Sequence, residues 1–158
     1  MLGCGYRPLG GNLVLGPDVQ QLEIRMFENS TDEPGLELVI GEALMEEFMR
    51  GGRLRAVPAG ESGGSQVVLS GVIQRVYVRP SSFSSVAISV EDSLEVTVNA
   101  SVLRVDTGEV LWQGFGLSAR QNFLSSADPL VYKSNKQMAM LRVATLIAED
   151  IHNDLFAY

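Results

Sequence analysis

The residues from Gly60 to Gly64 match the Gly-x-Ser-x-Gly pattern in which a serine serves as a nucleophile. Several acidic residues and His152, the only histidine, follow Ser62 along the chain, in an order that a catalytic triad can take. The pattern works only where a strand leads directly into a helix, because that sharp turn exposes the serine. Here a strand follows, so the segment indicates a flexible loop, and a hydrolase centred on Ser62 is the weakest of our hypotheses.

Two other patterns that could carry chemistry have simpler explanations. Residues 114–119 resemble a dinucleotide-binding glycine motif, but no helix follows them to hold a pyrophosphate, so we expect glycines that ease a strand bend or a close contact. His152 lies near Asp150 and Asp154 on a predicted helix, and residues two apart on a helix point to different sides. We therefore predict no catalytic residue, no bound metal and no cofactor.

The only cysteine, Cys4, follows a small residue that itself follows an aliphatic one. This is how a bacterial lipoprotein signal ends, which predicts that Cys4 is the acylated mature N-terminus and that the rest of the signal lies upstream of Met1. The alternative is a thiol without a role, buried or near a flexible terminus. A single cysteine excludes an internal disulfide, which leaves Cys4 without a structural task.

Composition limits the classes of function. A chain of 158 residues with 46% hydrophobic and 20% charged residues is typical of one globular domain. The net charge of −7 argues against broad nucleic-acid binding, which needs a basic surface. No apolar run reaches the roughly 18 residues that span a bilayer, so we expect any tie to a membrane to be covalent or peripheral.

We expect two parts, a lipobox remnant with a Gly/Pro-rich tether over residues 1–18 and a single domain over residues 19–158. The first strand begins at Val19, where apolar and polar residues alternate. A helix is expected to start at Pro34 and to end at Gly51 and Gly52, and a short strand is expected around residues 54–57.

A long strand is predicted from Gln66 to Arg79, with four valines on one face, followed by a turn or mobile loop over residues 80–85. These valines are Val68, Val72, Val76 and Val78. Alternation returns over residues 94–102, a hairpin turn follows at 106–109, and a returning strand covers 110–120. Asp128 and Pro129 open a final long helix.

These elements predict an α+β fold in the order β-α-β-β-β-α. Two amphipathic helices cannot bury their apolar stripes alone, so they should pack on one face of a four-stranded, mostly antiparallel sheet.

The strand Val96 to Leu103, taken with Cys4-Gly5-Tyr6, resembles the LPS-assembly lipoprotein family, which is LptE-like and also called rare lipoprotein B. Other matching segments occur in the expected order, and the resemblance covers almost the whole chain from Cys4. They are Leu22 to Asn29, Pro34 to Glu37, Val68 to Gly71, Thr107 to Trp112 and the C-terminal helix.

The resemblance implies a lipoprotein anchored through Cys4 on the periplasmic face of the Gram-negative outer membrane. Members of the family plug the β-barrel LPS-assembly protein and support delivery of lipopolysaccharide to the outer leaflet. Gly5 stands where an aspartate tends to signal inner-membrane retention. The expected partners are therefore the barrel and the membrane, with lipopolysaccharide as a possible direct ligand.

Phosphates and acidic sugars of lipopolysaccharide call for arginine or lysine donors. Lys133 is the first choice, because its surroundings are similar to a lysine-containing stretch in relatives. A basic residue expected before the central strand is absent, and Ser82 to Ser85 stand there. The candidates are Lys133, Lys136, Arg75, Arg79 and Arg120, with an ordinary solvated surface as the alternative for each.

The lumen of a large barrel is polar, so a plug should present polar strand faces. The outward residues Glu95, Thr97, Asn99 and Ser101 fit that requirement, and the loop carrying Phe83 and Ser84 could reach deeper into a barrel. The candidate barrel contacts are Phe83, Ser84, Thr97 and Asn99. The alternative function is a periplasm-facing lipoprotein that serves as an adaptor in another envelope assembly or secretion complex.

Overall fold

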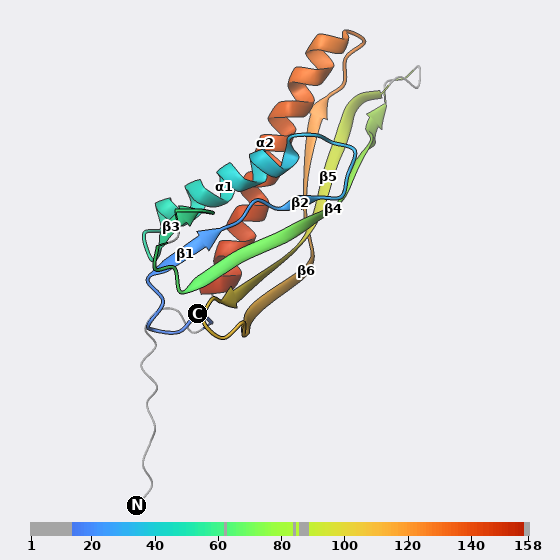
Figure 1. Cartoon of the computed structure of the whole chain (residues 1–158). Coiled ribbons are helices and arrows are strands. Elements are labelled where there is room, and N and C mark those ends of the chain that lie inside the picture. The colour runs from blue at the N-terminus through green and yellow to red at the C-terminus, as the bar shows by residue number, and fades with distance from the viewer. Residues whose placement is uncertain (1–13, 62, 84, 86–88, 157–158) are drawn as a thin grey trace, which may run out of the picture.

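A computed structural model of the chain describes residues 14–61, 63–83, 85 and 89–156. It contains six strands and two helices in these residues, arranged as a sheet with both helices on one face (Figure 1). The elements are β1 (Gln21–Ile24), β2 (Glu28–Asn29), α1 (Leu36–Gly51), β3 (Arg55–Pro58), β4 (Val67–Phe83), β5 (Ser89–Arg104), β6 (Val110–Leu124) and α2 (Pro129–Phe156).

The sheet is mixed, with the strand order β3-β1-β4-β5-β6 and with β2 also paired to β4. β4, β5 and β6 are antiparallel, whereas β1 runs parallel to both β3 and β4, and β2 runs parallel to β4. The α+β class and the pair of helices are confirmed, but the prediction of four mostly antiparallel strands in the order β-α-β-β-β-α is wrong. The physical reason is a β1-α1-β3 crossover, which makes a parallel pair, and a return of residues 28–29 to the edge of β4.

The ends of the helices follow local chemistry. α1 begins at Leu36, two residues later than expected, because Gly35 adopts a left-handed conformation with φ 87° that interrupts the helix at that point. Its C-terminal end has Gly52 at φ 63°, which confirms the predicted glycine cap. α2 begins at Pro129, and the side chain of Asp128 accepts a hydrogen bond from the backbone N–H of Leu130 at 2.9 Å.

The core lies between the helices and the sheet. Along β5, the even-numbered residues from Leu94 to Val102 are buried against the helices, and the odd-numbered residues face the other way, as the alternation predicts. Along β4 the prediction of one valine face is wrong, because an extra residue at Gln74 shifts the register. Val76 therefore shares a face with Val96, whereas Val72 lies beside Asn99 on the opposite face.

The central hairpin is longer than expected. β4 continues to Phe83 and β5 begins at Ser89, so residues predicted as a turn or mobile loop are paired strand. Of the predicted loop over residues 80–85, residues 80–83 belong to β4. Pro80 lies opposite Asp92, and register shifts follow it on both sides of Ser82. Such irregularities let an edge proline sit in a ladder without breaking it.

The two ends of the molecule differ in how many helices cover the sheet. At one end, which we call the tether end, the C-terminal ends of both helices lie near β1, β3 and the start of the described chain. At the other, the distal end, α2 extends beyond α1, because Lys136 of α2 meets Glu33 just before α1 begins. Residues 129–135 therefore overhang α1 by about 10 Å of helix, next to the end of β6 (Figure 1).

Candidate functional site

The face of the sheet that the helices leave open carries the polar residues of β5. Glu95, Thr97, Asn99 and Ser101 are each half-buried on this face, between the side chains of the two neighbouring strands. A groove of about 410 Å³ crosses its middle, where Asn99 and Ser101 meet residues of β2, β4 and β6. This open face therefore presents hydrogen-bonding side chains on the sheet, and neither of the two described helices covers it.

Three of the candidate cations come together on this open face. The strand register places Tyr77, Glu95 and Arg120 side by side, with Arg75 and Arg79 on either side of Tyr77 along β4. Arg120 donates to the Glu95 carboxylate through Nε at 2.9 Å and also through Nη2, and Arg79 Nη2 lies 3.5 Å from the same oxygen. Arg120 in the first place, with Arg79, lowers the pKa of Glu95.

The cluster therefore has an excess of positive charge. Glu95 supplies one carboxylate to two guanidinium groups, and the Arg75 guanidinium lies 5.4 Å from the centre of the Tyr77 ring. Planar guanidinium groups with free N–H donors bind phosphate and carboxylate well. We call Arg75, Arg79 and Arg120 the arginine cluster.

The two candidate lysines lie elsewhere, on α2 and thus on the helix side of the sheet. Lys136 Nζ lies 2.5 Å from Glu33 Oε2, and this pair joins α2 to the segment before α1. Lys133 is exposed on the overhanging part of α2. The five candidate cations thus form one group of three on the open face and two separate lysines on the helix side.

The candidate barrel contacts also occupy different settings. Asn99 is committed to the fold, because its Oδ1 accepts the backbone N–H of Gly116 at 2.8 Å and so holds the bulge in β6. Thr97 is half-buried beside Ser118 and Arg75 on the open face. Phe83 is the last residue of β4, and Ser84 lies outside the described residues.

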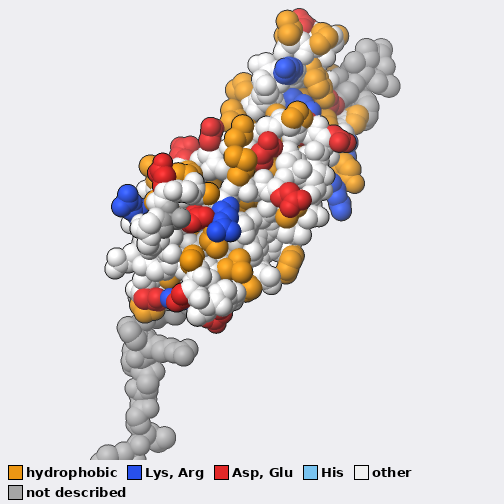
Figure 2. Space-filling view, in the orientation of Figure 1, with side chains coloured by type: hydrophobic (Ala, Val, Ile, Leu, Met, Phe, Trp, Pro, Cys, Tyr) orange, Lys and Arg blue, Asp and Glu red, His pale blue; other side chains and the backbone are white. Residues whose placement is uncertain are grey.

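Large hydrophobic side chains are exposed at the distal end. None of the residues from Pro129 to Met138 is buried, although the rest of α2 supplies much of the core. Leu130 is 79% exposed and Met138 is 68% exposed. Hydrophobic side chains gather there at the top of Figure 2. The exposed set at this end is Tyr77, Val78, Val90, Leu124, Leu130, Val131 and Met138.

Polar contacts help to hold the distal end together. Tyr132 packs edge-to-face on Phe123, with ring centres 5.5 Å apart. Burial, followed by the charge and the hydrogen bond of Asp92, raises the pKa of the Tyr132 hydroxyl. Asp92 itself is buried in β5. The overhang of α2 is thus fixed to the sheet while its apolar side chains point outward.

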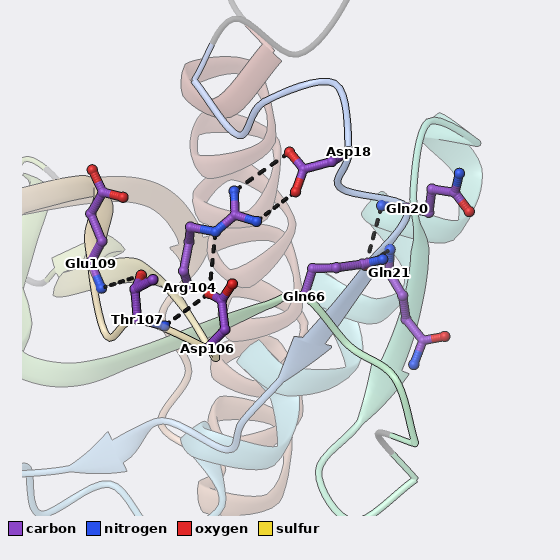
Figure 3. Close-up of polar contacts among 8 residues, drawn as sticks. All are labelled: Asp18, Gln20, Gln21, Gln66, Arg104, Asp106, Thr107 and Glu109. Carbon is purple, nitrogen blue, oxygen red and sulfur yellow. Dashed lines mark hydrogen bonds and ion pairs between the residues drawn. The ribbon is translucent and has the colours of Figure 1, made fainter.

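At the tether end, an ion-pair group holds the segment before β1 onto the β5–β6 hairpin (Figure 3). Arg104 binds both carboxylate oxygens of Asp18, at 2.5 and 3.5 Å, and its Nε lies 3.3 Å from Asp106. The hydrogen bond from Arg104 is the main cause of a lowered pKa of Asp18. Leu15, three residues before Asp18, is fully buried in the core.

Gln66 makes a second connection at the same end. Its Oε1 accepts the backbone N–H groups of Gln20 and Gln21 at 3.3 and 3.0 Å, as Figure 3 shows. The packed part of the chain therefore includes residues before Val19. Cys4 lies outside the described residues, and none of the described helices is long and apolar enough to cross a membrane.

The candidate catalytic residues find no supporting geometry in the described residues. Ser62 lies outside them, and His152 is packed between Phe48 and Phe156 at the helix–helix contact. No group of three or more His, Cys, Asp or Glu side chains is placed to hold a metal ion in the described ranges. Gly114 and Gly116 lie in β6, where Gly114 is closely approached by Trp112, which confirms their expected structural role.

The comparison with protein families decides the identity of the fold. The profile of the LptE family, described as lipopolysaccharide-assembly, matches residues 19–155. The chain belongs to the LptE family. No protein among the curated sequences compared with this chain matches it.

Solved structures with the same fold are distant in sequence from this LptE-family chain. A protein from Caulobacter crescentus described as a lipoprotein aligns with a TM-score of 0.58 at 15% identity, over 82% of this chain and 87% of that one. Rare lipoprotein B from Shewanella oneidensis gives 0.52 at 14%, over 85% and 92%. A minor lipoprotein from Acinetobacter baumannii gives 0.51 at 12%, over 87% and 90%. The predicted family resemblance is confirmed.

The sequence did not predict the arrangements that depend on strand register or on contacts between distant segments. The Asp18–Arg104 pair joins residues 86 positions apart, and no local pattern marks it. The arginine cluster could have been found from the sequence only by fixing the register of three strands. Its signal was the spacing of Arg75, Tyr77 and Arg79, which places all three on one face of a strand.

Proposed function

We propose that this chain is an outer-membrane lipoprotein that plugs and supports the β-barrel LPS-assembly protein during delivery of lipopolysaccharide to the outer leaflet. Membership of the LptE family supports this proposal. It is a binding and scaffolding role without catalysis. Cys4 carries the lipid anchor, which keeps the domain on the periplasmic face of the membrane.

The observation that carries the proposal is the contrast within one rigid body between a polar open sheet face and an apolar distal end. A monomeric domain usually buries side chains such as Leu130 and Met138, which are exposed here. A polar lumen suits the hydroxyl groups of Thr97 and Ser101 on β5, and a surrounding protein wall would cover the distal hydrophobic residues. The described chain begins at the opposite end, where the Asp18–Arg104 pair holds it, and the anchor on Cys4 precedes that segment in the sequence.

Direct binding of lipopolysaccharide is assigned to the arginine cluster in this proposal. Arg75, Arg79 and Arg120 lie on one face of the sheet, and only Glu95 offsets their charge within the cluster. A bisphosphorylated sugar needs at least two cations at fixed spacing, and three strands provide that spacing without loop rearrangement.

The experiment is co-purification of the tagged, lipidated protein with the barrel protein from outer membranes. Leu130→Asp combined with Val131→Asp should abolish recovery of the barrel, because both positions are exposed and neither supports the core. Glu149→Gln, on the tether half of α2, is the matched control and should leave recovery unchanged. Recovery of a different envelope complex in place of the barrel contradicts the proposal and supports the adaptor role.

A further inference from the structure

β6 is the long free edge of the sheet. It has 15 residues and pairs only with β5, whereas the opposite side is bordered by β3, a strand of four residues that ends in Pro58, and further along by residues 74–83 of β4. A short strand with a proline resists pairing with another chain, and a long regular strand invites it. The outer edge of β4 beyond Ile73 also has no partner strand among the described residues, but Pro80 removes one of its N–H groups and register shifts interrupt it. The long, regular edge at β6 is therefore the better place for an added strand.

The direction of the free backbone groups of β6 follows from two side-chain contacts. The carbonyl of Leu124 accepts a hydrogen bond from Asn135 Nδ2 at 2.9 Å, and the carbonyl of Asn122 accepts one from Gln121 Nε2, also at 2.9 Å. Both carbonyls thus point away from β5. Since backbone groups alternate in an antiparallel ladder, Ser118 and Arg120 also direct their N–H and C=O outward.

A groove runs along this edge, between β6 and α2. Its volume is about 440 Å³, and Phe123, Leu124, Met138 and Ala139 provide apolar walls. Arg142 lines the same groove, and no ion pair of Arg142 is found in the part of the chain that the structure describes. A segment bound along this edge would therefore meet main-chain hydrogen-bonding groups, an apolar groove and one cation.

We propose that the outer edge of β6 binds an extended segment of a partner protein as an added strand. The backbone of that segment pairs with Ser118 to Leu124 and displaces the two side-chain amides. Its apolar side chains, at every second position, enter the groove, and an acidic residue among them meets Arg142. This inference does not depend on the assignment of a barrel as partner.

A second copy of the chain fits this edge less well. In a pair of identical β6 edges, each groove would receive residues of the other β6. β6 contains no aspartate or glutamate, so it brings no carboxylate to Arg142. A strand that complements the groove carries apolar side chains and an acidic residue, and β6 has no acidic residue.

The test uses the full chain labelled with ¹⁵N and a synthetic peptide of alternating valine and threonine with one central glutamate. Binding should slow hydrogen exchange of the outward amides of Ser118, Arg120 and Asn122, and leave the β3 edge unchanged. The same peptide N-methylated at alternate residues should bind at least about tenfold more weakly, because its bonding edge is blocked. Absence of protection at millimolar peptide overturns the proposal.

Two protein variants, with a third as a control, separate the contribution of backbone pairing from that of Arg142. Ser118→Pro removes an outward N–H without removing a bond to β5 and should weaken binding by about tenfold, whereas Lys133→Ala should not. Arg142→Gln should erase the preference for a glutamate peptide over a glutamine one. If the chain alone dimerises in sedimentation and Ser118→Pro abolishes the dimer, the occupant is a second copy and the proposal is wrong.

Discussion

The tether end and the distal end are built from the same sheet and the same long helix, yet they are packed differently. At the tether end, Leu44, Ile147 and Ile151 are completely buried among α1, the C-terminal part of α2 and the parallel strands. At the distal end, the overhang of α2 lies on β5 and β6, and none of the first ten residues of α2 is buried. The tether end therefore carries the stability, and the distal end is left available for contacts.

The difference follows from helix length. α1 has 16 residues and α2 has 28, and the two lie beside each other from Lys136 to the α2 C-terminus. Where α1 is missing, the apolar side chains of α2 have no second helix to cover them. Exposed apolar side chains that gather at one end in this way are typical of an interaction surface.

Truncation of a matched leucine at each end gives the largest expected contrast. Leu44→Ala should lower the free energy of unfolding by about 2–5 kcal/mol, because the removed side chain is completely buried and leaves a cavity. Leu130→Ala should change it by no more than about 0.5 kcal/mol. Urea denaturation of both variants measures this, and similar losses at the two ends would contradict the division of roles.

Gly71 tests the boundary between the two ends, where the segment between β1 and β2 runs along the edge of β4 and the Phe27 side chain packs on Gly71. A Cβ at this position would lie 2.5 Å from the Asn99 carbonyl and from the Phe27 ring. Gly71→Ala should therefore cost about 1–3 kcal/mol of stability, as overpacked sites do.

The control for that change is Gly41→Ala in α1. No heavy atom lies within 4 Å of a Cβ there, so the substitution should stabilise the helix by up to about 1 kcal/mol. Thermal unfolding of the two variants should shift in opposite directions. A neutral Gly71→Ala variant would show that Phe27 shifts away from this position without cost.

Acid should weaken the tether end through His152. Its side chain is 13% exposed among Phe48, Phe156 and Gly51, and Glu47, Arg50 and Arg53 are the charged groups near it. Burial, with the charge of Arg53, lowers its pKa, so the fold favours the neutral imidazole. The stabilisation is complete above the unfolded pKa of about 6.5 and is lost as the pH falls towards the folded pKa.

Melting temperatures measured from pH 8 to about pH 5 check this expectation. The wild type should lose stability more steeply across this range than His152→Gln, which cannot titrate. Parallel curves for the two proteins would show that His152 is not the source of the acid sensitivity.

Alkali should instead weaken the distal end, through Tyr132. Burial and Asp92 raise its pKa, so the fold favours the protonated hydroxyl. That stabilisation is complete below the unfolded pKa of about 10 and is lost as the pH rises through the folded pKa. Hydrogen exchange of the first turns of α2 should accelerate above that pH in the wild type. In Tyr132→Phe the acceleration should be absent, and its persistence would assign it to another group.

Features of the tether end and the distal end differ in how far the sequence predicts them. The inward and outward faces of β5 follow from a local alternation, and the start of α2 follows from Asp128 and Pro129. The valine face of β4 does not, because the extra residue at Gln74 exists only in the pairing with β5. The arginine cluster and the overhang of α2 likewise depend on register and on the relative lengths of two helices, which no single segment encodes.

The Asp18–Arg104 pair tests whether the tether end also fixes where the anchoring segment leaves the domain. Asp18 is half exposed, so its contribution to global stability should be small, and Asp18→Asn should lower the melting temperature by about 2 °C or less. Its local effect should be larger, because Arg104 is the side chain that joins Asp18 to the β5–β6 hairpin. Exchange of the Val19 amide should accelerate in Asp18→Asn, and salt should reduce the difference from the wild type.

Asp106→Asn is the matched control for this pair. Asp106 binds the same guanidinium, but it belongs to the hairpin, so its loss does not release the segment that carries Leu15. Exchange at Val19 should therefore stay at the wild-type rate in Asp106→Asn. If both variants accelerate it equally, the position of Arg104 rather than its bond to Asp18 holds the segment, and the exit point is set by the hairpin alone.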